Sequence, residues 1–432
     1  MIRIEKALTH PIPYDINTIG SPEDILFFDI ETTGLSARSA GLYLIGVLTY
    51  DHDHWTLLQF FCEDVSDEPT VLQAFFDLLR QKKILISYNG DGFDIPFLRH
   101  MVEQFGLPYS FDAVESFDLF KKFRPLKRLL NLPDLKLKSC ERFLGIDRED
   151  RFTGGELIEV YFEWQKTKAP ALLDTLLLHN AEDIANLPNL LPMLNYSALL
   201  HSDFRLYAHE LLPQDSWFTE ENKTAVSGRA SHTPGIAHTG TARTTPLHPN
   251  ERSEQRNTTP LLHLSFTSVL SPMPTSDGVP EENDVHEEQN DRGQLRPNPD
   301  AVTLPQPMDV HGDFWSIHAE GNRVELYVQL FEGERKLFFA DYQNYYYLPA
   351  EDQVIHKSLA EFVDRSARKK ACAKNCYQRV YGCFLPEVCP VFTPGLQAAY
   401  RDKLLYARYT DAFWDDEVKS VAYLKSFLTS VL

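Results

Sequence analysis

Short apolar runs separated by turn-like residues dominate the first sixty positions of the chain. Residues 25–30, 42–50 and 54–62 are rich in Ile, Val, Phe and Tyr, which predicts three consecutive β-strands. Residues 68–81 behave differently, because Val, Leu and Phe recur there at spacings of three and four. That spacing places the apolar side chains on one stripe and predicts an amphipathic helix.

The pattern then alternates between strand-like and helix-like segments. We expect a fourth strand at 84–89, a helix near 93–106 and a short strand near 114–120. From residue 136 onward the spacing is helical, and it ends in the long apolar segment 170–195. Strands that first meander and then alternate with helices predict an α/β domain, a mixed sheet flanked by helices, over residues 1–208.

The remainder of the chain divides into a polar segment and a second ordered region. Residues 209–309 are dominated by Ser, Thr, Pro and acids, with one apolar anchor at 261–270, and we interpret them as a disordered linker. The pattern of residues 310–432 predicts a smaller C-terminal accessory α+β domain of unknown role. Its expected strands are 313–319, 323–331 and 336–348, and its expected helices are 351–365 and 395–428.

Charge is distributed unevenly over the 432 residues, whose formal net charge is −20. Residues 277–300 carry eight acids against two arginines, so much of the negative excess lies in the predicted linker. Residues 121–142 are basic instead, and they form either a solvated helix and loop or a surface for nucleic acid. The candidate phosphate contacts in this segment are Lys121, Lys122, Arg124, Lys127 and Arg128.

Apolar-segment length and cysteine content bear on the compartment. No run approaches the roughly twenty apolar residues that span a bilayer, and the first residues lack the apolar core of a signal peptide. Six cysteines are too sparse for a disulfide framework, so we expect a cytoplasmic protein with no membrane partner. Four of them lie in 372–389 without a Cys-x-x-Cys pair, which favours free or buried thiols over a zinc or iron–sulfur site.

Two carboxylates end the first predicted core strand. Asp29 and Glu31 follow a run that includes Phe27 and Phe28, and their spacing of two puts them on one side of the strand. Unpaired carboxylates are costly in such a place, which calls for a bound cation or a basic partner. On this pair alone, capping of the next turn is the commoner explanation.

Further candidates follow in the same domain. Asp94 comes after the fourth predicted strand, where an N-cap is the alternative to a metal ligand. His179 and Asp183 are four residues apart, so they share one face of the last predicted helix beside a packed surface. A lone histidine there would usually be a core residue. The ordered occurrence of all these groups favours one joint site.

Three segments carry a resemblance to a known family. DIETTGL at 29–35, YNGDGFDIPFL at 88–98 and HNAED at 179–183 resemble the three exonuclease motifs of the DEDD superfamily, whose fold is ribonuclease H-like. Within that superfamily the chain is most similar to the YprB-like group of bacterial ribonuclease H-like proteins. The likeness covers residues 24–195 and implies a 3′–5′ exonuclease acting on DNA or RNA.

The resemblance also implies a role for each matching residue. Asp29, Glu31 and Asp183 would hold two Mg²⁺ or Mn²⁺ ions, with Asp94 contributing from the second motif. His179 would orient or deprotonate the attacking water. It precedes Asp183 by four residues, whereas the histidine branch of the superfamily usually shows five, so its role is the least fixed.

Several neighbouring residues have two interpretations each. Asp118 either supplements the metal site or, more simply, is a solvated residue at a strand end. Thr32, Tyr88 and Asn89 are weak candidates for substrate contacts, although turn formation also explains Asn89. We expect Asn180 to face solvent and His356 to be an ordinary packing or surface residue of a helix.

Two functions compete with the exonuclease. In the first, the ribonuclease H-like fold is a catalytically silent module that binds nucleic acid or protein. In the second, the chain is an endonuclease of the ribonuclease H type, which the Asp-x-Glu on the first strand disfavours. The presence of the four acids and the histidine favours catalysis. The sequence leaves open the choice between DNA and RNA, the strandedness of the substrate and any protein partner.

Overall fold

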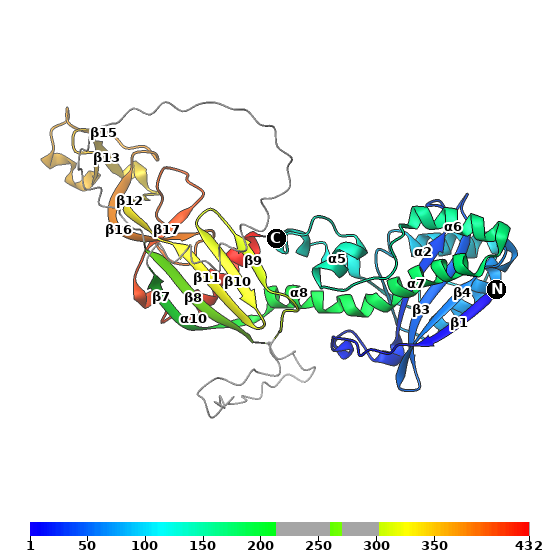
Figure 1. The fold of residues 1–432 in the computed structure, drawn as a ribbon. Coiled ribbons are helices and arrows are strands. Elements are labelled where there is room, and N and C mark those ends of the chain that lie inside the picture. The colour runs from blue at the N-terminus through cyan, green and yellow to red at the C-terminus, as the bar shows by residue number, and fades with distance from the viewer. Residues whose placement is uncertain (213–259, 270–301, 432) are drawn as a thin grey trace, which may run out of the picture. The chain divides into compact units, whose positions relative to one another are not determined.

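A computed structural model describes residues 1–212, 260–269 and 302–431 (Figure 1). The chain divides into two compact units. The first comprises Met1–His201 together with the short segment Val302–Pro307 and the end of the chain, and the second takes the other described residues. Each unit is considered by itself below.

A six-stranded mixed sheet forms the centre of the first unit, in the order β1-β4-β3-β2-β5-β6. β2 is antiparallel to β3 and parallel to β5, and β5 is parallel to β6. β2 is therefore an inner strand, and its backbone pairs with a neighbouring strand on each side. The bounds are β1 Ile2–Ala7, β2 Ile25–Thr32, β3 Leu42–Asp51, β4 His54–Phe61, β5 Ile84–Ser87 and β6 Glu115–Asp118.

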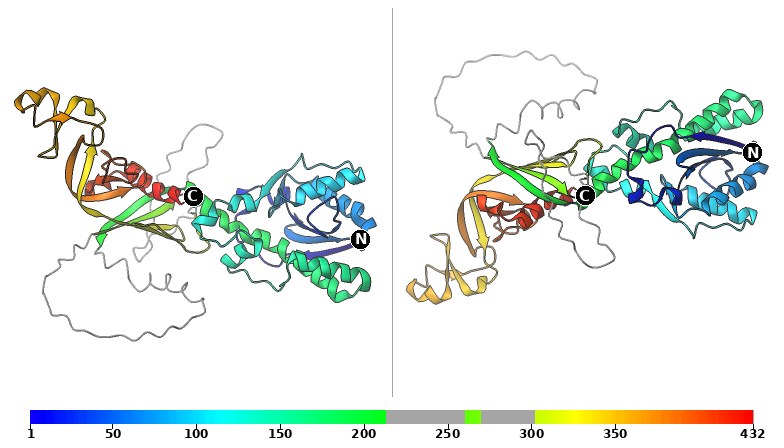
Figure 2. Two further views of the ribbon diagram at one scale, coloured as in Figure 1. Left: turned by 90° about the horizontal axis from the view of Figure 1, so that it is seen from above. Right: turned by 90° about the horizontal axis from the view of Figure 1, so that it is seen from below.

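Helices cover both faces of this sheet, as the two views of Figure 2 show. On one face Phe28 and Ile30 belong to a core shared with Phe75 of α1 and Leu98 of α2. On the other face Tyr43 and Phe61 join residues of α6 and α7 in a separate core. The helices are α1 Glu68–Leu79, α2 Asp94–Phe105, α3 Leu119–Phe123, α4 Leu126–Leu129, α5 Leu137–Phe143, α6 Gly154–Thr167, α7 Pro170–Leu190 and α8 Leu194–His201.

These elements agree with the mixed sheet and flanking helices that the sequence predicts. The three expected strands, the fourth strand, and the helices at 68–81 and 93–106 all form within a few residues of the predicted bounds. β1 was not predicted; it is an edge strand that pairs with β4 from Ile2 to Ala7. Four of its six residues are exposed and none is buried, so its apolar pattern is weak.

The second unit is rich in antiparallel sheet. Its main sheet has the order β7-β8-β11-β10-β9, and two three-stranded sheets have the orders β12-β16-β17 and β14-β13-β15. One long helix, α10 (Glu417–Ser430), accompanies them. The strands are β7 Asp203–Leu212, β8 Leu261–Val269, β9 Met308–His311, β10 Trp315–Glu320, β11 Arg323–Gln329, β12 Phe331–Phe338, β13 Tyr345–Leu348, β14 Gln353–His356, β15 Lys369–Lys370, β16 Tyr377–Glu387 and β17 Leu405–Arg408.

The predicted linker 209–309 is wrong where it meets this unit. β7 extends to Leu212, and β8 pairs with both β7 and β11 at the centre of the main sheet. The apolar anchor at 261–270 is therefore a core strand. Residues 213–259 and 270–301 lie outside the described residues.

Two helices predicted in the second domain are also corrected. Residues 351–365 form β14 and a 3-10 helix (Lys357–Phe362), and His356 ends that strand instead of lying in a helix. Of 395–428, the α-helical part begins only with α10, since Leu405–Arg408 is strand β17 and Asp411–Phe413 is a short 3-10 helix. Among the described residues, no helix combines the length and apolar character that crossing a membrane requires.

Candidate metal centre

The end of β2 places Asp29 and Glu31 on the face of the sheet that α7 covers. Side chains alternate along a strand, and Phe28 and Ile30 point into the core with α1 and α2. Asp29 and Glu31 therefore point the other way. The pairing register with β3 shifts between Glu31 and Thr32, so the regular ladder ends directly after the two carboxylates. This confirms that they share one side of the strand end.

α7 brings His179 and Asp183 to the same place. His179 Nε2 lies 3.5 Å from Glu31 Oε1 and 3.4 Å from Asp183 Oδ2. One ligand atom from each of Glu31, His179 and Asp183 lies within 4.8 Å of the others, an arrangement that can hold a metal ion. The spacing of four residues on one helix produces the His179–Asp183 part of this group.

Asp29 and Asp94 lie beside this group and are held by neighbouring donors. Asn180 Nδ2 donates to Asp29 Oδ2 at 3.1 Å. The backbone N–H of Ile30 donates to Asp94 Oδ1 at 3.2 Å, so the carboxylate from α2 lies next to Asp29. Asp94 is the first residue of α2 and its side chain does not cap that helix, because Phe93 occupies the N-cap position.

Burial and mutual repulsion raise the pKa values of three of these carboxyl groups. For Asp29 the largest cause is burial, followed by the charges of Asp94, Asp183 and Glu31. For Glu31 it is again burial, followed by Asp183. Burial also raises the pKa of Asp94 to about 7, although the hydrogen bond from Ile30 opposes the shift. The surrounding protein therefore does not fully compensate the negative charge that these groups would carry when ionised.

The carboxylate of Asp150 fixes the orientation of the His179 ring. His179 Nδ1 lies 2.7 Å from Asp150 Oδ2. Burial disfavours the charged form of Asp150, but hydrogen bonds from Lys138, the Phe152 backbone and His179 outweigh it and lower its pKa. Since an ionised carboxylate only accepts, Nδ1 carries the proton, and in the neutral ring the lone pair of Nε2 faces Glu31 and Asp183.

Arg148 is a buried cation next to the same carboxylates. Its Nη2 lies 2.5 Å from Asp183 Oδ1, and its Nη1 donates to Glu141 Oε1 at 3.1 Å. Nη2 is also 3.6 Å from Asp150 Oδ2. Arg148 thus holds one oxygen of Asp183 and leaves the other, Oδ2, facing His179.

The sequence interpretation missed both Asp150 and Arg148. They lie before α6 at the end of the segment SCERFLGIDRED (139–150), which the resemblance covers without giving either residue a role, and they contact His179 and Asp183 of α7. The acidic and basic character of RED at 148–150 was the other signal that could have drawn attention to them.

The prediction that Asn180 faces solvent is wrong. Instead of facing solvent it is fully buried, and it links Asp29 to Gln59, whose Nε2 donates to Asn180 Oδ1 at 3.0 Å. Gly46 on β3 makes room for it, since a Cβ at that position would lie only 2.1 Å from Asn180 Oδ1. The amide of Asn180 therefore has one available position, pointing at Asp29.

The other candidates have mainly structural contacts. Asp118 is buried, not solvated, and accepts hydrogen bonds from the backbone N–H groups of Asn89, Asp91 and Phe120. Asn89 has a positive φ of 65°, as expected of a turn residue. The Tyr88 hydroxyl donates to the Leu135 carbonyl, and that of Thr32 donates to the Gly34 carbonyl.

The basic residues of 121–128 lie on α3, α4 and the turn between them. Lys121 pairs with Asp91 at 2.6 Å, and the Lys122 ammonium lies over the Phe117 ring. Arg124, Lys127 and Arg128 are exposed. Contact of these residues, and of Thr32, Tyr88 and Asn89, with nucleic acid stays a prediction.

The four C-terminal cysteines form no metal centre within the described part of the chain, where Glu31, His179 and Asp183 are the sole group of suitable ligands. Cys376 is buried and Cys383 partly so, whereas Cys372 and Cys389 are exposed.

Comparison with known proteins defines the class of the first unit. Residues 26–195 match the model of the ribonuclease H superfamily, so this unit is a ribonuclease H-like domain. The match begins inside β2 and ends after α7, and it therefore contains all five residues of the candidate site.

Solved structures to which this chain is similar include a DNA polymerase and nucleases. A family B DNA polymerase from Pyrobaculum calidifontis is 20% identical with a TM-score of 0.32, over 41% of this chain and 25% of the polymerase. Exonuclease I of E. coli is 18% identical with a TM-score of 0.24, over 35% of this chain and 42% of that one. A structure described as the apo form of a nuclease is 17% identical with a TM-score of 0.27, over 42% and 76%. The chain thus spans less than half of the polymerase and of exonuclease I.

The residues present fit divalent cations. Carboxylate oxygens are the ligands that Mg²⁺ and Mn²⁺ prefer, and the His179 imidazole adds one nitrogen with its lone pair directed at the cluster. A bound cation would also offset the burial and the mutual repulsion that raise the pKa values of Asp29, Glu31 and Asp94.

Proposed function

We propose that the protein is a divalent-metal-dependent 3′–5′ exonuclease that hydrolyses phosphodiester bonds of DNA or RNA. The observation that carries this proposal is the convergence of mutually repelling carboxylates from β2 and α7 on the Nε2 of an oriented histidine. A site built only for stability would not gather buried like charges, because each adds an electrostatic cost. A cation bound for catalysis would offset this electrostatic cost.

The proposed division of labour follows the contacts. Asp29, Glu31 and Asp183 hold the cations, and Asp94 adds a further carboxylate from α2. Bound Mg²⁺ or Mn²⁺ ions supply the Lewis acidity that lowers the pKa of the attacking water and stabilises the leaving oxygen. His179 accepts or directs the proton of that water through Nε2, and Asp150 keeps its ring in the required tautomer.

Asn180 and Arg148 are positioning residues in this proposal. Asn180 donates to one oxygen of Asp29 and leaves the other oxygen for a cation. Arg148 does the same for Asp183 through Oδ1. Each carboxylate is thereby held in one orientation before a cation arrives, which reduces the cost of ordering the site.

One observation favours a second candidate, the catalytically silent binding module. Arg148 already neutralises part of the charge of Asp183, so a resident cation does some of the work that a metal ion would do. In that case the fold would bind nucleic acid or protein without cleavage. The Nε2 lone pair of His179 has no function in this alternative.

Digestion of 5′-labelled single strands of DNA and RNA, with Mg²⁺ or Mn²⁺, decides between the two. Asp183→Asn removes a metal ligand, and Asp174→Asn is the matched control because Asp174 is an exposed acid on the same helix. We expect a ladder that shortens from the 3′ end with the wild-type protein and the control, and none with Asp183→Asn. Binding without cleavage on every strand and with either metal would contradict the proposal and support the silent module.

A further inference from the structure

The acid-free segment with the most basic residues lies in the second unit. Residues 365–386 contain six basic residues and no acidic one, in a chain whose net charge is −20. The six are Arg365, Arg368, Lys369, Lys370, Lys374 and Arg379. Such a concentration in an otherwise acidic protein suggests a surface for an anionic partner.

The small sheet β14-β13-β15 places several of these cations beside a row of tyrosines. β15 is the dipeptide Lys369–Lys370, and it pairs with β13 so that Lys370 is opposite Tyr346. Residues directly opposite each other share one face, and neighbours along a strand point to opposite faces. Lys370 and Tyr346 therefore share one face, while Tyr345 and Tyr347 point to the other.

The two faces have different contacts. Tyr345 stacks on Phe339 with ring centroids 5.1 Å apart, and the Tyr347 hydroxyl donates to Asp352 Oδ1. These rings are used in packing. On the opposite face Tyr346 lines a cleft of about 650 Å³ together with Lys357, Arg365 and Arg368.

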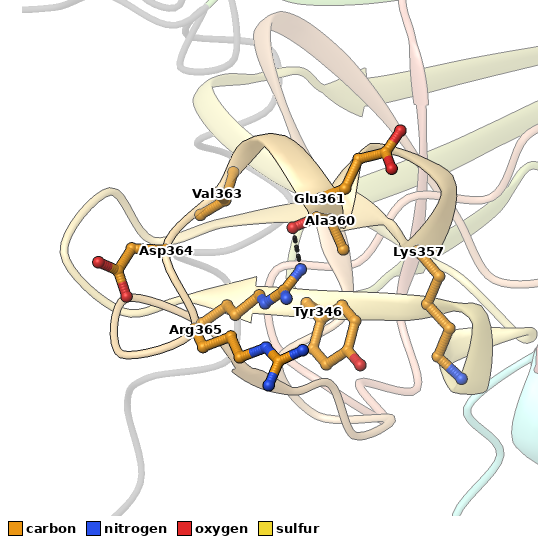
Figure 3. A pocket seen from close by; sticks show the side chains of 8 residues that line it. Tyr346, Lys357, Ala360, Glu361, Val363, Asp364 and Arg365 are labelled. Carbon is orange, nitrogen blue, oxygen red and sulfur yellow. Dashed lines mark hydrogen bonds between the residues drawn. The ribbon is translucent and has the colours of Figure 1, made fainter.

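Figure 3 shows how the charged side chains lie around this ring. Arg365 extends toward Tyr346, whereas the carboxylates of Glu361 and Asp364, which also line the cleft, point away from it. The Arg368 guanidinium lies 5.0 Å from the centre of the Tyr346 ring and donates to the Ala360 carbonyl. One cation is thus held beside the aromatic face by the protein itself.

The cations of the cleft are available for a partner. Lys357, Arg365 and Lys370 are exposed, and neither they nor Arg368 form an ion pair with a carboxylate in the described parts of the chain. Arg379 differs, because it pairs with Asp352 and lies 3.7 Å from Glu334. We define the tyrosine–arginine cleft as the lining residues Tyr346, Lys357, Arg365 and Arg368, together with Lys370, which lies opposite Tyr346 on the same face of the sheet.

We infer that the tyrosine–arginine cleft is a binding site for single-stranded nucleic acid. A tyrosine ring with unpaired cations around it offers a stacking surface for a base and contacts for the flanking phosphates. A double helix is too wide and stiff to reach a ring in a cleft, and a membrane is too flat, whereas a single strand can enter. The inference concerns the second unit and does not depend on cleavage by the first.

Binding of fluorescent oligodeoxythymidylate and oligouridylate to the full-length protein tests it, with EDTA present to prevent cleavage. The triple variant Lys357→Gln/Arg365→Gln/Lys370→Gln should bind about 100-fold more weakly at roughly 0.1 M salt, because it removes three phosphate contacts. The slope of log affinity against log salt should fall by about two. Tyr346→Ala should weaken binding about tenfold, and Tyr346→Phe should retain it.

A charge-matched control and a crosslink locate the site. Lys374→Gln/Arg401→Gln/Lys419→Gln also removes three positive charges from the second unit but leaves the cleft intact, and its binding should change several-fold less. Photocrosslinking with 4-thiouridine should label Tyr346 or its strand. Equal affinities of both triple variants, with crosslinks confined to residues 24–195, would overturn the inference. If the cleft variants lose binding to phosphatidylserine vesicles but still bind oligonucleotides, the inference is overturned in favour of a lipid-binding surface.

Discussion

The metal centre and the tyrosine–arginine cleft handle charge in opposite ways. In the metal centre the charged groups are largely buried on β2, α2 and α7, and each is held by a second group such as Asn180, Ile30 or Arg148. In the cleft the cations are mostly exposed and are carried by a short strand, a 3-10 helix and the irregular segment between them. Buried charge must be positioned in advance because its desolvation is expensive, whereas exposed charge can adapt to its partner.

The largest expected effect comes from the centre of the acidic site. Asp29→Asn should lower nuclease activity about a thousandfold, because a lost metal ligand removes several kcal/mol of charge stabilisation. The same change should stabilise the metal-free protein, since it removes a carboxylate whose pKa is raised by burial and by Asp94, Asp183 and Glu31. Single-turnover cleavage and urea unfolding measure the two effects.

Asp94→Asn is the internal comparison for that variant. The backbone N–H of Ile30 still has an acceptor in the asparagine side chain, and we expect a smaller loss of activity than for Asp29→Asn. Equal losses would show that Asp29 matters no more for activity than Asp94. A fall in the stability of the metal-free Asp29→Asn protein would contradict the repulsion that we describe.

The orientation of His179 provides the next effect. Asp150→Asn replaces the acceptor of the Nδ1 proton and should lower activity about 10- to 100-fold, as usual for a group that orients a catalytic or metal-binding histidine. Asp147→Asn is the control, because Asp147 is an exposed acid in the same loop. The pH profile of cleavage should shift in the first variant and stay unchanged in the second. Identical profiles would remove Asp150 from the mechanism.

How much of this site the sequence predicts depends on the range of the contacts. Asp29 and Glu31 are two apart on a strand, and His179 and Asp183 are four apart on a helix, so local geometry placed each pair correctly. Asp150 and Arg148 reach α7 from a loop with no regular spacing, and Asn180 depends on the space above Gly46. Those contacts are set by tertiary packing, which periodicity does not encode.

The same distinction explains the errors in the second unit. β8 is a core strand of nine residues, but the polar composition of 209–309 as a whole outweighed its apolar pattern in the prediction. Residues 351–365 have apolar residues at helical spacing, yet pairing of β14 with β13 takes precedence. Strand pairing between distant segments overrides local propensity.

Gly46 tests whether Asn180 has only one available position. Gly46→Ala should lower the free energy of unfolding by about 1–3 kcal/mol, because the new Cβ meets the Asn180 amide at 2.1 Å in a packed region. Activity should fall as well, since Asn180 holds Asp29. Gly154→Ala is the matched control, as nothing lies within 4 Å of its Cβ at the start of α6. Chemical denaturation of both variants gives the comparison, and equal stabilities would refute it.

The pH dependence of stability follows from the raised pKa of Asp94. In the folded protein this pKa is about 7, above the usual carboxyl range, so the folded state binds more protons than the unfolded state between about pH 4 and 7. Protonation of Asp94 therefore stabilises the folded state fully at pH values below the pKa of Asp94 in the unfolded state. This stabilisation is lost as the pH rises through the pKa of Asp94 in the folded state. Asp94→Asn should flatten the dependence of metal-free unfolding on pH over this window. A steeper dependence in the variant would contradict the shift.

The smallest effect belongs to the cleft. Arg365→Gln should change the free energy of unfolding by no more than about 0.5 kcal/mol, because the side chain is exposed and pairs with no carboxylate in the described residues. Thermal unfolding measures this directly. A large loss of stability would mean that the cleft is a structural element, and the contrast with the metal centre would fail.

Calorimetric titration of the metal-free protein with Mn²⁺ in buffers of different ionisation enthalpy tests the central claim most directly. Our account predicts saturable binding that releases protons near neutral pH, because Asp29, Glu31 and Asp94 must be deprotonated to bind a cation. Asp29→Asn should abolish most of the binding, and the exposed-acid control Asp174→Asn should preserve it. Absence of binding, or binding without proton release that Asp29→Asn leaves unchanged, would contradict the account.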